Sequence, residues 1–145
     1  MSDPTTNAIH KGGCLCGAVR YEITAEPMFS GFCQCRDCQR LTGNGHAGGM
    51  AFPESAVKIA GKLTYYDSRA DSGATVSRGF CPKCGSRLVG KGSGMPGLMM
   101  VFPGGLDDPG TFKPQMVVFA SRAQAWDHLD PTLARFPEMP PPPPK

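Results

Sequence analysis

The chain has 145 residues and a formal net charge of +3, with 15 Lys and Arg against 12 Asp and Glu. This length favours a single domain with a hydrophobic core of its own. Because the basic residues are scattered and no apolar run reaches membrane-spanning length, we expect neither nucleic acid nor membrane as a partner. The polar N-terminus lacks the apolar centre of a signal peptide, and we therefore expect a cytoplasmic protein.

Short apolar runs bounded by turn residues predict a mainly β fold. In the first run Val19, Tyr21 and Ile23 alternate with polar residues, the pattern of a half-buried strand. Similar runs follow, each flanked by Gly, Pro, Asp or Ser, at 46–52, 62–68, 74–80, 97–102 and 115–120. We expect about eight short strands of about five to six residues each.

Helical structure is predicted at two places only. Residues 37–41 form one or two turns that end at a glycine, and residues 130–136 form another short helix. We divide the chain into an N-terminal arm (1–11), a single folded domain (12–136) and a proline-rich tail (137–145). The tail is expected to be disordered and polyproline-like.

Seven cysteines make metal binding the leading interpretation. Thiols stay reduced in the cytosol, and an odd number argues against a complete disulfide framework. Cysteines that served as small core hydrophobes would be scattered, whereas these are grouped at the spacings of zinc ligands. The groups are Cys14 and Cys16, then Cys33, Cys35 and Cys38, then Cys81 and Cys84.

The motif CPKCG, Cys81 to Gly85, is the most specific local signal. Two thiolates three residues apart can hold one ion where the chain turns tightly, and Pro82 and Gly85 favour such a turn. A redox-active CxxC is the rival interpretation, but that motif belongs at the start of a helix in a βαβ unit. Because residues 86–90 are expected to continue as a strand, we favour a pair of zinc ligands.

The motif CLC supplies a second pair of ligands. In a strand, Cys14 and Cys16 point to the same face, so that both sulfurs can reach one ion. Together with the CPKCG pair they would form a closed four-cysteine site that crosslinks distant strands. Loss of that ion would unfold or loosen the domain. A different division, in which the CPKCG pair joins Cys35 and Cys38, is also compatible with the spacing.

The three cysteines of residues 33–38 lie in one bend and lack a fourth thiol. Catalytic zinc sites commonly have three protein ligands and an exchangeable fourth position, which predicts such a site here. Alternatively, His46 completes a closed site of three cysteines and one histidine, with His10 and His128 as more remote candidates.

A zinc ion with three thiolate ligands is soft, so it suits an incoming thiolate better than it suits the generation of hydroxide. We therefore expect a substrate thiol at the open position, with Arg36 and Arg40 of the same bend available to bind its carboxylate. Solvated surface arginines are the simpler interpretation of either residue alone. His46 is the candidate for proton transfer because it is the nearest histidine, although a core or surface histidine has the same sequence signal.

The sequence resembles the glutathione-dependent formaldehyde-activating family, also called the centromere protein V/formaldehyde-activating domain. The resemblance rests on GGCLCGAVRYEI (12–23), FCQCRDCQRLTG (32–43), GFCPKCGSRL (79–88) and VVFASRAQAWDHLD (117–130). It implies a zinc-dependent antiparallel β-tent fold. It also implies a structural zinc at Cys14, Cys16, Cys81 and Cys84, and a second, catalytic zinc at Cys33, Cys35 and Cys38. The activity it implies is condensation of formaldehyde with glutathione, a carbon–sulfur lyase reaction in the synthetic direction.

We predict a small enzyme with two Zn²⁺ per chain that forms or breaks a carbon–sulfur bond between a small thiol and an aldehyde. The alternative is a non-catalytic, zinc-stabilised interaction module that binds a protein through a sheet edge or the loops at 91–97 and 104–110. Exposed Met95 and Leu98 would serve that role. An open fourth metal position beside a cleft favours the enzyme, whereas closure by His46 favours the module.

Overall fold

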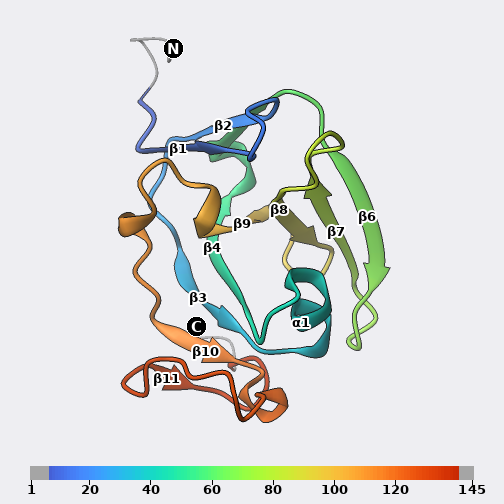
Figure 1. The fold of residues 1–145 in the computed structure, drawn as a ribbon, viewed down its shortest axis with the longest axis vertical. Coiled ribbons are helices and arrows are strands. Elements are labelled where there is room, and N and C mark those ends of the chain that lie inside the picture. Colours follow the sequence, from blue (N-terminus) through green and yellow to red (C-terminus); the bar gives the residue numbers. More distant parts are fainter. Residues whose placement is uncertain (1–6, 141–145) are drawn as a thin grey trace.

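The structure is a computed structural model that describes residues 7–140. Most of the expected arm (1–6) and the end of the expected tail (141–145) lie outside the described residues. The fold is mainly β, as predicted, with one short helix, α1 (Arg36–Thr42), among the described residues (Figure 1). The strands are β1 (His10–Gly13), β2 (Arg20–Ile23), β3 (Phe29–Cys33), β4 (Ala47–Pro53), β5 (Val57–Ala60), β6 (Thr64–Arg69), β7 (Thr75–Phe80), β8 (Arg87–Gly92), β9 (Leu98–Val101), β10 (Met116–Val118) and β11 (Ala134–Arg135). Short 3-10 turns are η1 (Glu54–Ala56), η2 (Pro103–Gly105), η3 (Pro109–Thr111) and η4 (Ala120–Arg122).

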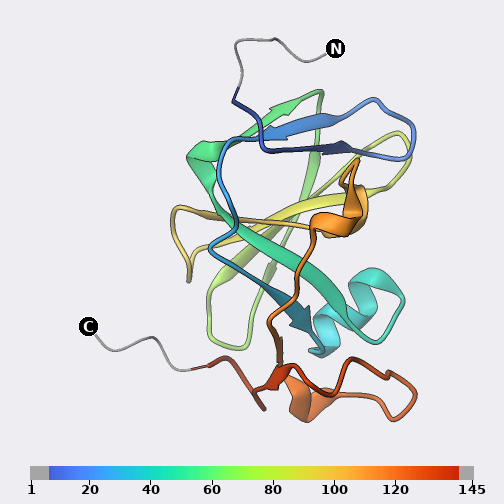
Figure 2. The same cartoon turned by 90° about the vertical axis from the view of Figure 1, so that its left-hand side faces the viewer.

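The strands form two sheets. The smaller has the order β1-β2-β5 and is antiparallel, and the larger has the order β11-β10-β3-β4-β9-β8-β7-β6. In the larger sheet β10 runs parallel to both β3 and β11, and the other pairs are antiparallel. The smaller sheet lies at one end of the molecule, and α1, β10 and β11 lie at the other (Figures 1 and 2). No helix of residues 7–140 is long and apolar enough to cross a membrane.

One hydrophobic core lies between the two sheets. The alternating residues of β2 face it as predicted, with Tyr21 and Ile23 2% and 0% exposed. Phe52 of β4 is also fully buried, as is Val101 of β9. Burial of a side chain of this size stabilises the fold by roughly 1.5–3 kcal/mol.

Gly12 of β1 lies so close to the turn η2 and to Tyr21 of the neighbouring strand that no side chain fits there. A Cβ at this position would lie 2.3 Å from the backbone oxygen of Gly105 and 2.4 Å from the hydroxyl of Tyr21. The same residue forms an isolated bridge with Leu106. Glycine is therefore required here by the close backbone approach.

The structure differs from the sequence-based expectations in several elements. β1, β3 and β5 were not predicted, because they are short and two of them contain glycine, which weakens a strand signal. The helix expected at 130–136 is wrong. Asp130 instead accepts hydrogen bonds from the backbone and hydroxyl of Thr132 in a turn, and β11 follows.

The folded chain also extends past both expected domain boundaries. β1 begins at His10, inside the expected arm, and pairs with β2. In the expected tail, the backbone oxygen of Pro137 accepts a hydrogen bond of 2.8 Å from the hydroxyl of Ser121. Residues 137 and 138 thus contact the turn η4.

Candidate metal centres and the adjoining cavity

The first cysteine cluster joins the two sheets. Cys14 and Cys16 lie in the turn between β1 and β2, and Cys81 and Cys84 lie in the turn between β7 and β8. The four sulfurs lie within 4.8 Å of one another, with 3.7 Å between those of Cys14 and Cys16 and 3.8 Å between those of Cys16 and Cys81. This is the four-cysteine set expected from the spacing.

Backbone and side-chain donors surround this first cluster. The amides of Val19 and Lys83 lie 3.3 and 3.4 Å from the sulfurs of Cys14 and Cys81. The hydroxyl of Ser86 lies 3.2 Å from the sulfur of Cys84, and this hydrogen bond lowers the pKa of Cys84 to about 5. Such donors stabilise thiolates, which are the form that binds a metal.

Ser86 also connects the two arms of the first cluster. Its hydroxyl oxygen accepts a hydrogen bond of 3.0 Å from the backbone amide of Leu15, which lies between the two cysteines of CLC. The two ligand pairs are thereby held in register by a contact that involves no cysteine.

The second cluster consists of Cys33, Cys35 and Cys38, whose sulfurs also lie within 4.8 Å of one another. Cys33 ends β3, Cys35 is the N-cap of α1, and its sulfur accepts a hydrogen bond of 3.3 Å from the amide of Cys38. Hydrogen bonds from the thiols of Cys33 and Cys38 lower the pKa of Cys35 to about 2. The same contact with Cys35 raises the pKa of Cys33 to about 12, and contacts with Cys33 and Cys35 raise that of Cys38.

Both clusters could hold a metal ion, because each gathers soft sulfur donors around one point. The alternative pairing of Cys35 and Cys38 with Cys81 and Cys84 is not formed. Within residues 7–140, no fourth Cys, His, Asp or Glu joins the second cluster.

His46 does not join the second cluster as a fourth ligand. Its Nδ1 atom lies 2.9 and 3.1 Å from the two carboxylate oxygens of Asp127. The ring packs edge-on against Phe32, with 5.0 Å between the centroids. Of the more remote candidates, His10 lies near Glu26 and His128 is exposed, and neither joins a cysteine cluster.

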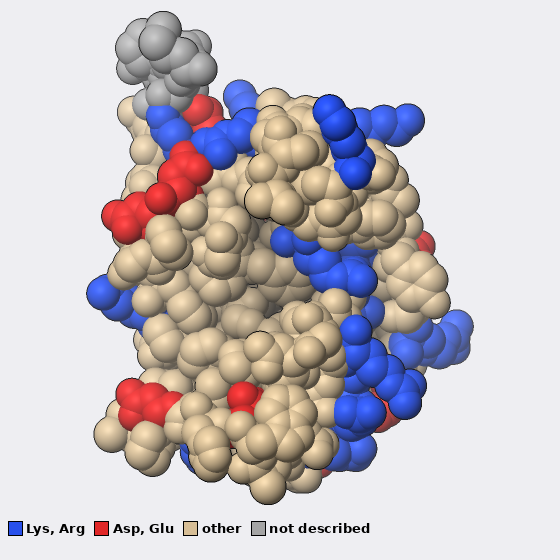
Figure 3. Space-filling view, viewed as in Figure 1, with Lys and Arg blue, Asp and Glu red and all other residues tan. Residues whose placement is uncertain are grey.

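A cavity of about 490 Å³ lies beside α1, the helix that carries Cys38, and also borders the CPKCG turn at Gly85. Thr42, one helical turn after Cys38, lines it together with His46 and Arg87. The hydroxyl of Thr42 lies 2.8 and 3.1 Å from the backbone oxygens of Cys38 and His46, and so connects α1 to the backbone of the histidine. Figure 3 shows this face of the molecule hollowed near its centre, with most Lys and Arg on one side of the hollow.

Arg87 was not among the residues selected from the sequence. It lies in β8, two residues after the CPKCG turn, and its guanidinium stacks over Phe80 at 5.9 Å. None of the ion pairs formed within residues 7–140 involves it. The predicted Arg36 donates to Gln39, and neither it nor the exposed Arg40 lines the cavity. Proximity to a ligand motif was the one signal that could have identified Arg87.

Two buried glutamines tie the cysteine loop to the C-terminal segment. Gln34, between Cys33 and Cys35, is 0% exposed and donates to Asp127 at 3.0 Å. Gln39, in α1, donates at 2.8 Å to the backbone oxygen of Gln34 and at 3.0 Å to that of Arg122. The loop of the second cluster is thus hydrogen-bonded both to Asp127 and, through Gln39, to the backbone of Arg122.

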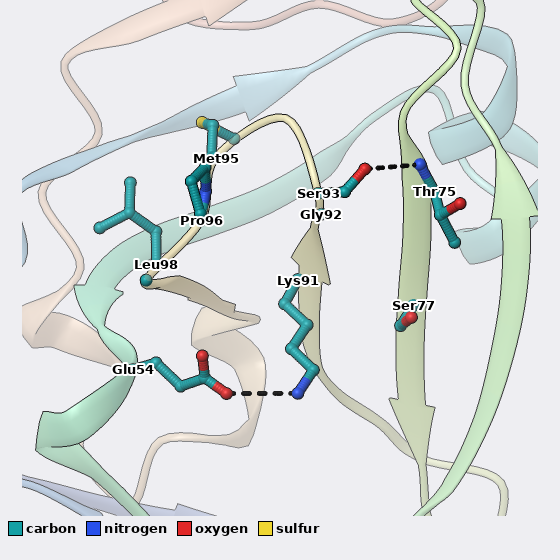
Figure 4. Close-up of a pocket in the computed structure, with 10 residues that line it drawn as sticks. Glu54, Thr75, Ser77, Lys91, Gly92, Ser93, Met95, Pro96 and Leu98 are labelled. Atoms are coloured by element: carbon teal, nitrogen blue, oxygen red, sulfur yellow. Dashed lines mark hydrogen bonds and ion pairs between the residues drawn. The ribbon is translucent and has the colours of Figure 1, made fainter.

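A second cavity, of about 380 Å³, lies at the hairpin of β8 and β9 (Figure 4). Lys91 and Glu54 form an ion pair of 3.2 Å in its wall, and Ser93 accepts from the amide of Thr75 at 2.9 Å. Met95 is exposed at this hairpin and Leu98 is half-buried. No cysteine lines either cavity, but the larger one is bordered by Thr42 of α1 and by Gly85 of the CPKCG turn, the elements that carry cysteines of the two clusters.

The chain belongs to the glutathione-dependent formaldehyde-activating enzyme family, whose family model matches residues 9–122. A crystal structure of a Rhodobacter sphaeroides protein has a similar fold, with a TM-score of 0.56 and 19% sequence identity. The similarity covers 87% of this chain and 98% of that one. No curated protein matches the chain.

Proposed function

We propose that the protein is a zinc-dependent carbon–sulfur lyase that joins a small, glutathione-like thiol to an aldehyde such as formaldehyde, or cleaves the product. In the joining direction the S–H bond breaks and a carbon–sulfur bond forms, while the carbonyl oxygen gains the proton. The reaction is an addition, so it needs no oxidant or reductant. We also propose a cytoplasmic location, where small thiols are kept reduced.

The two cysteine clusters have different roles in this proposal. Cys14, Cys16, Cys81 and Cys84 would hold one zinc ion that stabilises the fold. Cys33, Cys35 and Cys38 would hold a second, whose chemistry is that of a soft, positively charged centre with affinity for a substrate sulfur. Three protein ligands are typical of catalytic zinc, and four are typical of structural zinc.

The cavity residues bind and orient the substrates. Arg87 binds a carboxylate of the thiol, because it faces the cavity without an acidic partner in the described part of the chain. Arg36 and Arg40 stay as alternative carboxylate ligands outside the cavity. His46 accepts the proton that the thiol loses and returns it to the carbonyl oxygen.

The observation that carries this proposal is the position of His46. Closure of the second cluster by this histidine would have favoured an interaction module without catalysis. Instead, Nδ1 of His46 is engaged by Asp127, and the same residue lines the cavity beside α1. Three protein donors gather at the second cluster among residues 7–140, and the cavity proposed for the substrate lies beside the helix that carries Cys38.

The test measures adduct formation from glutathione and formaldehyde by exchange NMR, with the uncatalysed reaction in buffer as reference. We expect acceleration by the zinc-loaded protein and its loss in Cys35→Ser. Arg87→Ala should raise KM about 10- to 100-fold, the equivalent of a charge-assisted hydrogen bond of about 1.5–3 kcal/mol. Arg69→Ala, at an exposed arginine of β6 that does not line the cavity, is the matched control. No acceleration with several small thiols and aldehydes would refute the proposed function.

A further inference from the structure

Asp127 is a buried carboxylate whose partners are unusual. Its side chain is 6% exposed, and a carboxylate this buried requires hydrogen-bonding partners. They are Nδ1 of His46 and the amide of Gln34, and no Lys or Arg of residues 7–140 forms an ion pair with it. The carboxylate thus contacts only the imidazole of His46 and the side-chain amide of Gln34, in the loop of the second cluster, among the described residues.

The contact determines which nitrogen of His46 carries the proton. A carboxylate can only accept hydrogen bonds, so Nδ1 must donate. In the neutral imidazole the proton is then on Nδ1, and Nε2 is left with a free lone pair. No hydrogen bond within the described residues engages Nε2, and the residue lines the cavity beside α1.

Three further contacts fix the geometry of this pair. Phe32 packs edge-on against the imidazole ring, with 79° between the two ring planes. Gly45 permits the close approach of the carboxylate, because a Cβ at that position would lie 2.4 Å from Cγ of Asp127. Gln34 is fully buried and holds the second carboxylate oxygen at 3.0 Å.

We infer that Asp127 is a positioning residue that holds His46 in the Nδ1–H tautomer, with Nε2 available as the proton acceptor in the cavity. The inference rests on the proposed function for the identity of the reaction, whereas the orientation of the imidazole stands on the structure. Asp127 acts through His46 and does not itself contact substrate. His46→Gln should lower kcat by on the order of 10²–10⁴, the usual contribution of acid–base catalysis.

The experiment is long-range ¹H–¹⁵N NMR of the zinc-loaded protein labelled with [¹⁵N]histidine, at a pH where imidazole is neutral. The His46 signals are assigned by their loss in His46→Gln. We expect the Nδ1–H tautomer in the unaltered protein and loss of that preference in Asp127→Asn. In the thiol–aldehyde assay, Asp127→Asn should lower kcat by about 10-fold or more with little change in KM. His128→Gln, which alters the residue next to Asp127, is the control and should change neither the tautomer of His46 nor kcat.

Gly45→Ala provides an independent variant, because it displaces the carboxylate without altering it. It should shift the tautomer in the same direction, and it replaces Asp127→Asn if that variant does not fold. An Nε2–H tautomer of His46 in the unaltered protein would overturn the inference. So would a variant that loses the tautomer preference without losing kcat. If the unaltered protein accelerates no thiol–aldehyde reaction, the proposed function fails, and the tautomer measurement alone decides the orienting role of Asp127.

Discussion

The two cysteine clusters should differ in their contribution to stability, because they close chain loops of very different length. Cys16 and Cys81 are 65 residues apart and join the smaller sheet to the larger one. The chain-entropy relation for a cross-link gives about 4 kcal/mol for a loop of that length. Cys33 and Cys38 are five positions apart in one bend, for which the same relation gives about 2 kcal/mol.

The comparison uses two double variants that each remove two thiols. Cys14→Ser with Cys16→Ser removes one arm of the first cluster, and Cys35→Ser with Cys38→Ser removes most of the second. We expect the first pair to lower the free energy of unfolding by about 2 kcal/mol more than the second, or about 1 M in the urea midpoint. Circular dichroism follows unfolding, and metal analysis counts the ions retained. Equal losses of stability, or a larger loss at the second cluster, would refute this reasoning.

Three further outcomes can be measured on single variants. Burial raises the pKa of Tyr21 to about 12. The contribution of this residue to the free energy of unfolding is therefore complete below pH ~10 and is lost as the pH rises toward 12. In Tyr21→Phe, the free energy of unfolding should not show this alkaline decrease. Gly12→Ala should cost about 1–3 kcal/mol in thermal or urea unfolding through overpacking, whereas Gly104→Ala, with open space at Cβ, should not. Ser86→Ala removes the hydrogen bond that lowers the pKa of Cys84. That thiolate is then protonated at higher pH, and acid titration with a chromogenic chelator should show earlier metal release; an unchanged midpoint would contradict the role of the hydroxyl.

The cysteine clusters could be predicted from the sequence because each motif brings its own sulfurs close together. A CxxC turn and a CxC segment each bring two sulfurs together within a few residues, although Cys14 and Cys16 lie in a turn and not in the expected strand. The strand β2 could be predicted for the same reason, since the alternation of Val19, Tyr21 and Ile23 directly gives the buried face. The helix α1 ends at Gly43, as expected, with that residue in the left-handed region at φ 72°.

The residues that hold His46 and the loop of the second cluster in place could not be predicted, because their partners are distant in sequence. Asp127 meets His46 across 81 residues and Gln34 across 93. An aspartate in a polar loop and a glutamine between two cysteines carry no sequence signal of burial. Arg87 was missed because the cavity it lines exists only after β4, α1 and β8 have been assembled. The prediction of a helix at 130–136 was wrong because the side chain of Asp130 accepts hydrogen bonds from Thr132 in a turn.

The contact between Gln39 and the backbone of Arg122 spans 83 residues, and this has a consequence for biosynthesis. A nascent chain leaves the ribosome from its N-terminus, so the four thiols of the first cluster are all available once residue 84 has emerged. The loop of the second cluster must wait for residues 122–127 before its glutamines are paired. Ion uptake during translation should therefore occur in a fixed order, with the intersheet centre filled first.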